Sequence, residues 1–546
     1  MLWVRGVSAK SLNSLVRPSN LSAFALLTFA GVVASGCNAH DLKGVEIEGS
    51  SVSTNSLPLD VNRKVDVLLV LDNSGSMGEE QANLAANFGP VIERLEEVGA
   101  DYRIGITTTD IGGHSCEGQA TGGSLHLSSC LDRPGTFTFN GNDQFAAACE
   151  AHCQLSGEEL EIRPTEGCGD SEEAARPWIQ SYNGVSNLPE GVTTLDAFQC
   201  FAPQGISGCG WESPLEAMAR ALENMHNPDR PEYGFLRDDA LLAVVVVTDE
   251  VDCSYNPEHA DALFLDGAFF ADGVSYATSA ACWNAGTDCE GESPYASCSD
   301  ASYDASGNPT EDRDAAVLRP VDHYVELLEG VAAQKTSGRE VLVSVIAGVP
   351  LGYQDGEAIV YADSPDNSTQ ELFGIGDGCS NVVNGEVQTA VPPVRLVSFA
   401  SAFPSAFKDE LNLYSVCSED YTPALEDIVA NITVELPPAC YGDCVKDIDA
   451  STEELDYNCN VYQDTSSGSE QLPECERDGM GGHELPAGAD ACWIAHTGDD
   501  LDPQCQVEGQ NLEFELVRRS GVEVPCDAVV SAACELSTLD AEACQW

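Results

Sequence analysis

The chain has 546 residues, more than one hydrophobic core usually supports, so we expect two domains or one domain with large insertions. Its hydrophobic fraction of 43% and charged fraction of 21% exclude wholesale disorder. The 90 Asp and Glu residues against 24 Lys and Arg residues give a formal net charge of -66, which excludes nucleic acid as a partner because phosphates are neutralised by basic side chains.

The first 36 residues have the layout of a secretory signal peptide. Arg5, Lys10 and Arg17 form a basic start, and the apolar run at 21–34 is too short to span a bilayer. The sequence Ala-Ser-Gly then precedes Cys37 and resembles a bacterial lipobox. We therefore predict lipidation of Cys37 and anchoring in the cell envelope, at the outer membrane or cell surface. An ordinary signal peptide cleaved nearby is the alternative.

The cysteine count agrees with export of the chain. Of the 23 cysteines, removal of Cys37 leaves 22, an even number that a fully oxidised protein can pair completely. No pair of CxxC motifs occurs, so the spacing does not favour a zinc site.

The next elements alternate between buried strands and helices. Residues 37–63 are polar and Ser-rich and are expected to form a tether. Apolar runs then predict strands, and helical patterns lie between them, which indicates a mostly parallel sheet with helices on both faces. A short antiparallel edge strand is expected at 135–139. The predicted strands are 65–71, 102–108, 240–248, 340–347 and 413–416, and the helices are 79–95, 214–225, 321–334 and 423–430.

Long segments rich in Gly, Ser, Asp and Cys interrupt this pattern. About 100 residues separate the second strand from the helix near Pro214, and further segments fill 250–317 and 348–398. We expect disulfides to staple these insertions into compact excursions. From 437 to 546 nine cysteines occur and helical periodicity fades, which predicts a small disulfide-held module rich in strands, including one at 512–518. Both parts have odd cysteine counts, so either a bridge crosses the boundary or each part keeps a free thiol.

Two acids follow predicted strands. The first strand leads into Asp72, Ser74 and Ser76, a DxSxS pattern in which Gly75 permits a tight turn. The strand at 240–248 leads into Asp249. The carboxyl ends of parallel strands meet at one edge of a sheet, where carboxylate and hydroxyl oxygens are suitable ligands for Mg²⁺ or Ca²⁺.

This arrangement resembles the metal-ion-dependent adhesion site of von Willebrand factor type A domains. The resemblance implies a Rossmann-like type A domain over 64–436 and one divalent cation held by Asp72, Ser74, Ser76 and Asp249. Three further stretches resemble a group of cysteine-rich type A lipoproteins of predatory and marine bacteria. They are 247–254 (VTDEVDCS), 208–212 (GCGWE) and 414–417 (YSVC).

The third metal loop departs from the family, in which a Thr before a helix binds the metal. Counting back from the helix at Pro214 places Glu212 at that position. We expect Glu212 to be a ligand or a neighbouring acceptor, although capping of the helix is an alternative. A third carboxylate neutralises the cation further and favours Ca²⁺ over Mg²⁺.

The sequence favours a binding function over catalysis. It contains no HExxH, GxSxG or P-loop motif. We predict a lipid-anchored protein that binds a protein or glycan partner through its metal and is not an enzyme. The alternatives are an envelope-assembly component with a purely structural metal and, less favoured, a metal-dependent hydrolase with Glu212 as the base.

Overall fold

The computed structural model describes most of the chain after residue 53. Its described residues belong to one compact unit, Val52–Trp546. The predicted signal peptide, Cys37 and most of the predicted tether lie outside them. The described ranges are 54–59, 61, 63–113, 121–165, 173–335, 341–383, 386–404, 411–436, 438–449, 451–452, 454–477, 482–525, 527–537 and 544.

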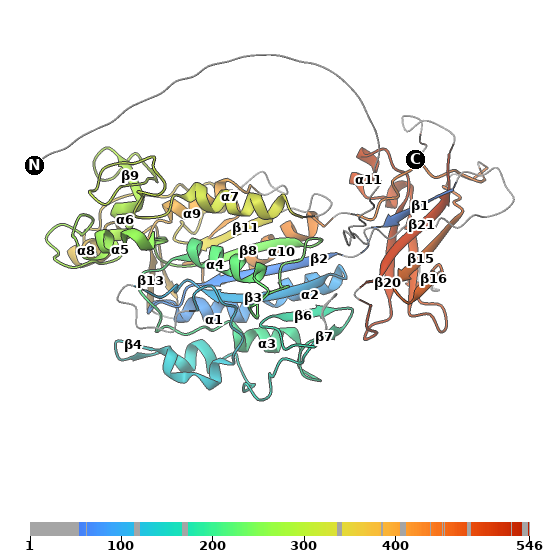
Figure 1. Ribbon diagram of the computed structural model, residues 1–546, viewed down its shortest axis with the longest axis horizontal. Coiled ribbons are helices and arrows are strands. Elements are labelled where there is room, and N and C mark those ends of the chain that lie inside the picture. Colours follow the sequence, from blue (N-terminus) through green and yellow to red (C-terminus); the bar gives the residue numbers. More distant parts are fainter. Residues whose placement is uncertain are drawn as a thin grey trace, which may run out of the picture. The chain divides into compact units, whose positions relative to one another are not determined.

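A seven-stranded sheet forms the centre of the α/β body, in the order β14-β11-β8-β2-β3-β6-β7 (Figure 1). The strands from β14 to β3 are parallel, whereas β6 and β7 add an antiparallel edge. The predicted α/β class with a mostly parallel sheet is confirmed. The strands are β2 (Lys64–Leu71), β3 (Asp101–Thr108), β6 (Ile179–Tyr182), β7 (Val185–Ser186), β8 (Leu241–Val247), β11 (Val341–Ala347) and β14 (Leu413–Ser415).

Helices cover both faces of this sheet because its central strands are apolar on both sides. Val67 and Leu69 of β2 pack on one face with α1, α2, α3 and α10, and Leu68 and Val70 pack on the other with α4, α5, α6, α7 and α9. Full burial of each such side chain stabilises the fold by about 1.5–3 kcal/mol. The helices are α1 (Gly78–Asn87), α2 (Gly89–Glu97), α3 (Thr194–Phe201), α4 (Pro214–His226), α5 (Ala260–Phe264), α6 (Ala280–Gly286), α7 (Val321–Ala332), α8 (Asn367–Phe373), α9 (Val394–Ser401) and α10 (Thr422–Val434).

The helix predicted at 79–95 is two helices. Helix α1 ends at Asn87, and α2 begins at Gly89 with Pro90 in its first turn. Proline has no backbone N–H and its ring obstructs the preceding turn, so one continuous helix is broken at this point.

The edge strand predicted at 135–139 is wrong. Pro134–Phe137 forms a 3₁₀ turn, and Thr138–Phe139 (β4) pairs with Asn142–Asp143 (β5) in a hairpin. Asn140 and Gly141 between them have φ angles of 50° and 83°, the left-handed pair that a tight two-residue hairpin requires. The antiparallel edge of the central sheet is provided by β6 instead.

Disulfides close the long insertions, as predicted. Four of the bridges join cysteines within one insertion, and Cys379–Cys417 joins the last insertion to the chain just after β14; all of them restrict the unfolded chain. Cys209 is also disulfide-bonded. The bridges of the body with both partners described are Cys130–Cys149, Cys153–Cys200, Cys253–Cys282, Cys289–Cys298 and Cys379–Cys417. Two of these insertions also form small hairpins: β9 (Thr287–Glu290) pairs with β10 (Ser297–Asp300), and β12 (Cys379–Val383) with β13 (Glu386–Ala390).

The described residues after 437 form mainly strands, as predicted, with one short helix, α11 (Pro503–Val507). One sheet has the order β1-β21-β15-β16, and β19 pairs with β20 and β17 with β18. These strands are β15 (Cys459–Thr465), β16 (Gly468–Leu472), β17 (Glu476–Arg477), β18 (His483–Glu484), β19 (Ala491–His496), β20 (Glu513–Arg518) and β21 (Val529–Glu535). Four bridges lie within the module: Cys440–Cys505, Cys444–Cys544, Cys459–Cys534 and Cys475–Cys492.

Strand β1 (Thr54–Leu59) comes from the stretch predicted as a tether. It pairs antiparallel with β21, and Leu57 and Leu59 both pack into the core of the module. These leucines are two residues apart and so lie on one face of the strand. The predicted tether therefore ends earlier than 63, because this short apolar pair is masked by its polar surroundings in the sequence.

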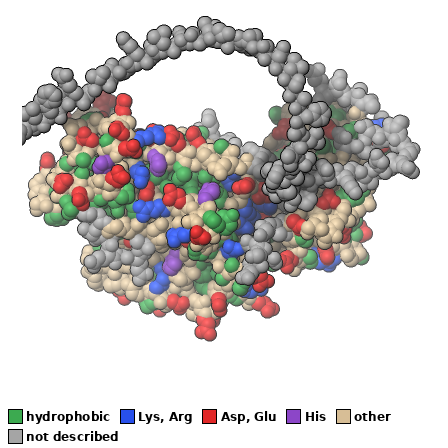
Figure 2. Space-filling view, in the orientation of Figure 1, with side chains coloured by type: hydrophobic (Ala, Val, Ile, Leu, Met, Phe, Trp, Pro, Cys, Tyr) green, Lys and Arg blue, Asp and Glu red, His purple; other side chains and the backbone are tan. Residues whose placement is uncertain are grey.

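No helix among the described residues is both long enough and apolar enough to cross a membrane. Acidic side chains are scattered over the visible face rather than gathered in one patch (Figure 2). Nine disulfides between described cysteines are typical of proteins that fold in an oxidising, extracytoplasmic compartment.

Candidate metal centre

Three neighbouring parallel strands end at the same edge of the central sheet. Asp72 follows β2, Thr109 follows β3 and Asp249 lies two residues beyond β8. Backbone bonds hold these ends in line: the Asp72 N–H donates to the Val247 carbonyl at 2.9 Å, and the Thr109 N–H donates to the Leu71 carbonyl at 3.1 Å. The predicted convergence of Asp72 and Asp249 thus follows from the strand order.

The DxSxS loop turns its oxygen atoms toward one another. The Ser74 N–H donates to Asp72 Oδ1 at 2.8 Å, and the Ser74 and Ser76 hydroxyl oxygens lie 3.2 Å apart. Asp72 and Ser74 are buried, whereas Ser76 is exposed. The loop therefore presents one carboxylate and two hydroxyls, with its opening to solvent at Ser76.

Gln81 of α1 fixes the backbone of this loop. Its side-chain amide donates to the Asp72 carbonyl at 2.7 Å and to the Gly205 carbonyl at 2.8 Å, while its oxygen accepts from the Gln204 N–H at 2.8 Å. The buried Gln81 amide makes all of these hydrogen bonds and so ties the metal loop to residues 204–205, which precede Glu212 in the chain.

Glu212 lies in the site and does not cap α4. Its side chain is buried, Oε2 accepts from the Thr109 hydroxyl, and Oε1 has no hydrogen-bond partner. The first free N–H groups of α4 are bound instead by Asp252 and Ser254, at 3.3 and 2.9 Å. The capping role is thus filled by other residues, and the Glu212 carboxyl group faces the metal loop.

The carboxyl groups around the loop raise one another's pKa. Burial, and then the neighbouring Asp72, raise the pKa of Asp249 to about 7. Burial followed by Asp72 likewise raises the pKa of Glu212 well above its usual range. Two acids outside the predicted set, Glu80 and Glu250, have strongly raised pKa values because of burial and then the charge of Asp249.

These residues fit a divalent cation. Buried carboxylates are costly unless they are paired or bind a metal, and the charged groups that act on this cluster are themselves carboxylates. Glu212 Oε1 and Asp249 Oδ1 are both buried without a hydrogen-bond partner. Hard oxygen donors of this kind suit Ca²⁺ or Mg²⁺.

The acids alone do not form a closed cage. Among the described residues, the one set of three Cys, His, Asp or Glu ligand atoms within 4.8 Å of one another is Cys130, Cys149 and Cys153. A cation at the metal loop would thus need the Ser74 and Ser76 hydroxyls as well as the carboxylates. The cation would be bound by Asp72, Ser74, Ser76, Glu212 and Asp249. The hydroxyls of Thr109 and Thr248 would support the carboxylates of Glu212 and Asp72.

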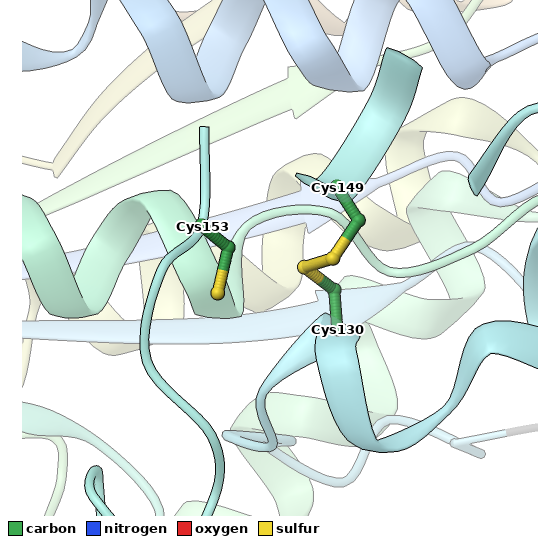
Figure 3. Close-up of side chains that lie close together, drawn as sticks. All are labelled: Cys130, Cys149 and Cys153. Atoms are coloured by element: carbon green, nitrogen blue, oxygen red, sulfur yellow. A yellow bond between two sulfur atoms is a disulfide. The ribbon is translucent and has the colours of Figure 1, made fainter. Parts of the chain in front are cut away.

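The cysteine cluster is not a metal site. Figure 3 shows Cys130 bonded to Cys149 with the Cys153 sulfur beside them, and Cys153 is itself bonded to Cys200. Metal binding by cysteine requires a thiolate, and sulfur atoms in disulfides do not provide one.

Sequence reasoning missed the residues that support the ligands. The Thr248 hydroxyl donates to Asp72 Oδ2 at 2.5 Å, and Thr109 bonds Glu212. The Asp110 carboxylate accepts from the Gly112 and Cys209 N–H groups at 2.8 and 3.0 Å and so ties the third loop down. The available signal was position, since each of these residues lies at the end of a predicted buried strand or just after it.

A hairpin from the first insertion lies against the metal loop. A Cβ atom added to Gly75 would lie 2.2 Å from Phe139 Cδ1, and one added to Gly78 would lie 1.6 Å from Gln144 Oε1. Both glycines of the Ser-Gly-Ser-Met-Gly stretch therefore permit close approach of the β4–β5 hairpin and the residue that follows it.

No protein-family model matches the chain, and no curated protein matches it. Solved structures with some likeness include the pilus adhesin SpaC from Lactobacillus rhamnosus GG in two forms, at 8% and 9% identity and TM-scores of 0.24 and 0.26. The matches cover 88% and 87% of this chain and 40% and 39% of those chains. The pilus adhesin RrgA from Streptococcus pneumoniae matches at 10% identity and a TM-score of 0.15, over 89% of this chain and 58% of that one. At such TM-scores these likenesses carry no argument.

Proposed function

We propose that the α/β body is a type A domain that binds a partner through a divalent cation held by Asp72, Ser74, Ser76, Glu212 and Asp249. The observation that carries this proposal is the pair of buried carboxylate oxygens without partners, Glu212 Oε1 and Asp249 Oδ1, beside the hydroxyls of the DxSxS loop. A cation would satisfy both oxygens.

The protein's own residues prepare the site for reversible binding. Thr248 and Thr109 orient the Asp72 and Glu212 carboxylates, and Gln81 fixes the loop backbone. Exposed Ser76 marks the side from which a partner approaches. When bound, the cation would supply a coordination position for an oxygen atom of the partner. No step of this function requires a catalytic base.

We propose further that the protein works at the cell envelope, held by a lipid on Cys37. The disulfides support an oxidising compartment, and the polar stretch before β1 would separate the folded unit from the membrane. One lipid chain binds a membrane weakly, so the acylation of a lipoprotein cysteine with several chains matters for stable anchoring.

Calorimetry with Ca²⁺ and Mg²⁺ tests the metal site. We expect one cation per chain in the wild type and at least about a hundredfold loss of affinity in Asp72→Ala, because one hard ligand and the anchor of the loop are removed. Asp304→Ala is the matched control, since Asp304 is a half-buried loop acid away from the acidic cluster and accepts hydrogen bonds from the Ser306 and Asn308 N–H groups. Unchanged affinity in folded Asp72→Ala, with folding checked by circular dichroism, would contradict the proposal.

A further inference from the structure

Phe139 is an aromatic side chain that the fold does not bury. Two residues earlier, Phe137 is fully buried and packs against Phe145, whereas Phe139 is 42% exposed at the tip of the β4–β5 hairpin. Exposure of this size means that the ring contributes only part of its area to the core. The rest of the ring remains accessible to a partner.

The hairpin places this ring on the metal loop. Phe139 pairs with Asn142 across the tight Asn140–Gly141 turn, which fixes the end of β4. Three atoms of the ring lie within 2.8 Å of the point that a Cβ on Gly75 would occupy. Gly75 directly precedes Ser76, the exposed ligand of the loop. The Phe139 ring therefore packs on the residue next to Ser76, and both side chains are exposed to solvent.

The charge of the site selects the kind of oxygen atom that it accepts. Asp72, Glu212 and Asp249 carry enough carboxylate to neutralise a dication, and Glu80 and Glu250 lie beside them. A cation surrounded by these carboxylates attracts a further carboxylate less strongly than a cation with fewer acidic ligands does. At long range, the net charge of -66 repels an acidic partner. Neutral oxygens, such as hydroxyls, are favoured.

A neutral sugar offers both neutral oxygen atoms for the cation and an apolar face for the Phe139 ring. Two adjacent hydroxyls of a pyranose supply two neutral hard oxygens to one cation, and the ring C–H groups form a flat apolar face that packs on an aromatic ring. Resting on the proposed function, we infer that the partner is a neutral carbohydrate whose diol binds the cation and whose C–H face packs on Phe139. Phe139 is thus a residue that determines specificity and does not hold the metal.

The test uses the full chain in detergent with Ca²⁺ and four immobilised probes: mannan, galactan, polygalacturonate and polylysine. We expect retention on mannan or galactan that EDTA abolishes. Phe139→Ala should weaken it at least about tenfold, Phe139→Trp should keep it, and Ca²⁺ affinity should stay unchanged in both variants. Val387→Ala is the matched control. Like Phe139, Val387 is an exposed apolar residue (68% exposed), and it lies on the β12–β13 hairpin beside the site.

The outcomes separate the two proposals. If the wild type does not bind Ca²⁺, the proposed function is overturned. Ca²⁺ binding without retention on either neutral polysaccharide overturns the carbohydrate inference alone. So does retention only on polygalacturonate or polylysine, or wild-type retention in Phe139→Ala. An equal loss in Val387→Ala would indicate a protein partner that spans both hairpins.

Discussion

Glu212 is the residue that most distinguishes this site, because it places a carboxylate where the type A domains that the sequence resembles have a threonine hydroxyl. It is buried beside Asp72, and its pKa is raised by that burial and then by the Asp72 charge. The Thr109 hydroxyl holds one of its oxygens and leaves the other toward the loop. The residue thus sets the charge of the site rather than the geometry of α4.

Replacement of Glu212 by Thr tests this role. Removal of one carboxylate should lower Ca²⁺ affinity by about tenfold and raise the affinity of the metal-loaded protein for acetate, because the cation becomes more electrophilic. Both quantities are measured by calorimetry. Glu93→Gln is the control, since Glu93 is an exposed acid of α2 outside the buried acidic cluster. An acetate affinity no higher than that of the wild type would show that Glu212 does not tune the metal.

The convergence of Asp72 and Asp249 could be predicted from the sequence, but the residues that support these side chains could not. Asp72 and Asp249 follow apolar runs, so the topology of a parallel sheet alone brings them together. The roles of Thr109 and Thr248 depend on which strands are neighbours and on side-chain directions that appear only in the folded chain. Phe139 was missed for a different reason: its position follows from a local turn and not from a periodic pattern.

At the scale of elements, the β12–β13 hairpin holds the Asp249 loop in place. The Val391 N–H, just after β13, donates to the Asp249 carbonyl at 2.9 Å, and the Gln388 amide donates to Glu79 Oε2 at 2.7 Å. A Cβ on Gly348 would lie 2.0 Å from the Val391 carbonyl oxygen. Backbone therefore packs directly on backbone behind Asp249, and only glycine leaves room for it.

Gly348→Ala should disturb this contact. The added methyl group meets backbone that cannot rotate away, so we expect a loss of roughly 1–3 kcal/mol in the free energy of unfolding and weaker Ca²⁺ binding. Urea unfolding and calorimetry measure the two effects. Gly330→Ala is the matched control, because Gly330 is exposed in α7 with open space around it. This variant should have a free energy of unfolding about 0.5–1 kcal/mol higher than the wild type. Equal stability of the two variants would contradict the packing argument.

The long apolar runs predicted their strands closely, because a strand buried on both faces has few alternatives. The helix at 79–95 and the strand at 135–139 failed for local reasons, since Pro90 and the Asn140–Gly141 turn determine the backbone there. Strand β1 failed for a long-range reason: its partner, β21, lies more than 400 residues away along the chain, and pairing at such separation leaves no local pattern.

At the scale of the whole molecule, the disulfides between described cysteines close the two parts of the chain separately. The nine disulfides between described cysteines each stay on one side of residue 437. Each part therefore gains its own restriction of the unfolded chain, and neither depends on the other for those bonds.

Anchoring is tested on the whole chain expressed in a bacterial host. We expect the mature protein to begin with an acylated Cys37, to fractionate with membranes, and to contain no free thiol among the other 22 cysteines. Mass spectrometry of the N-terminal peptide and of alkylated cysteines measures both points. Cys37→Ser should release the chain from the membrane fraction without changing Ca²⁺ binding. A mature N-terminus elsewhere in the wild type would rule out the lipid.

The path of the chain into the sheet also determines how the molecule would resist mechanical load. Strand β1 is followed almost at once by β2, and β2 ends at Asp72 in the metal loop. A pull between a lipid at Cys37 and a partner at the loop would therefore run along β2. This strand is paired over its length with β3 on one side and β8 on the other. The covalent backbone of β2 would carry most of such a pull, and any sliding of β2 would strain both rows of hydrogen bonds in shear.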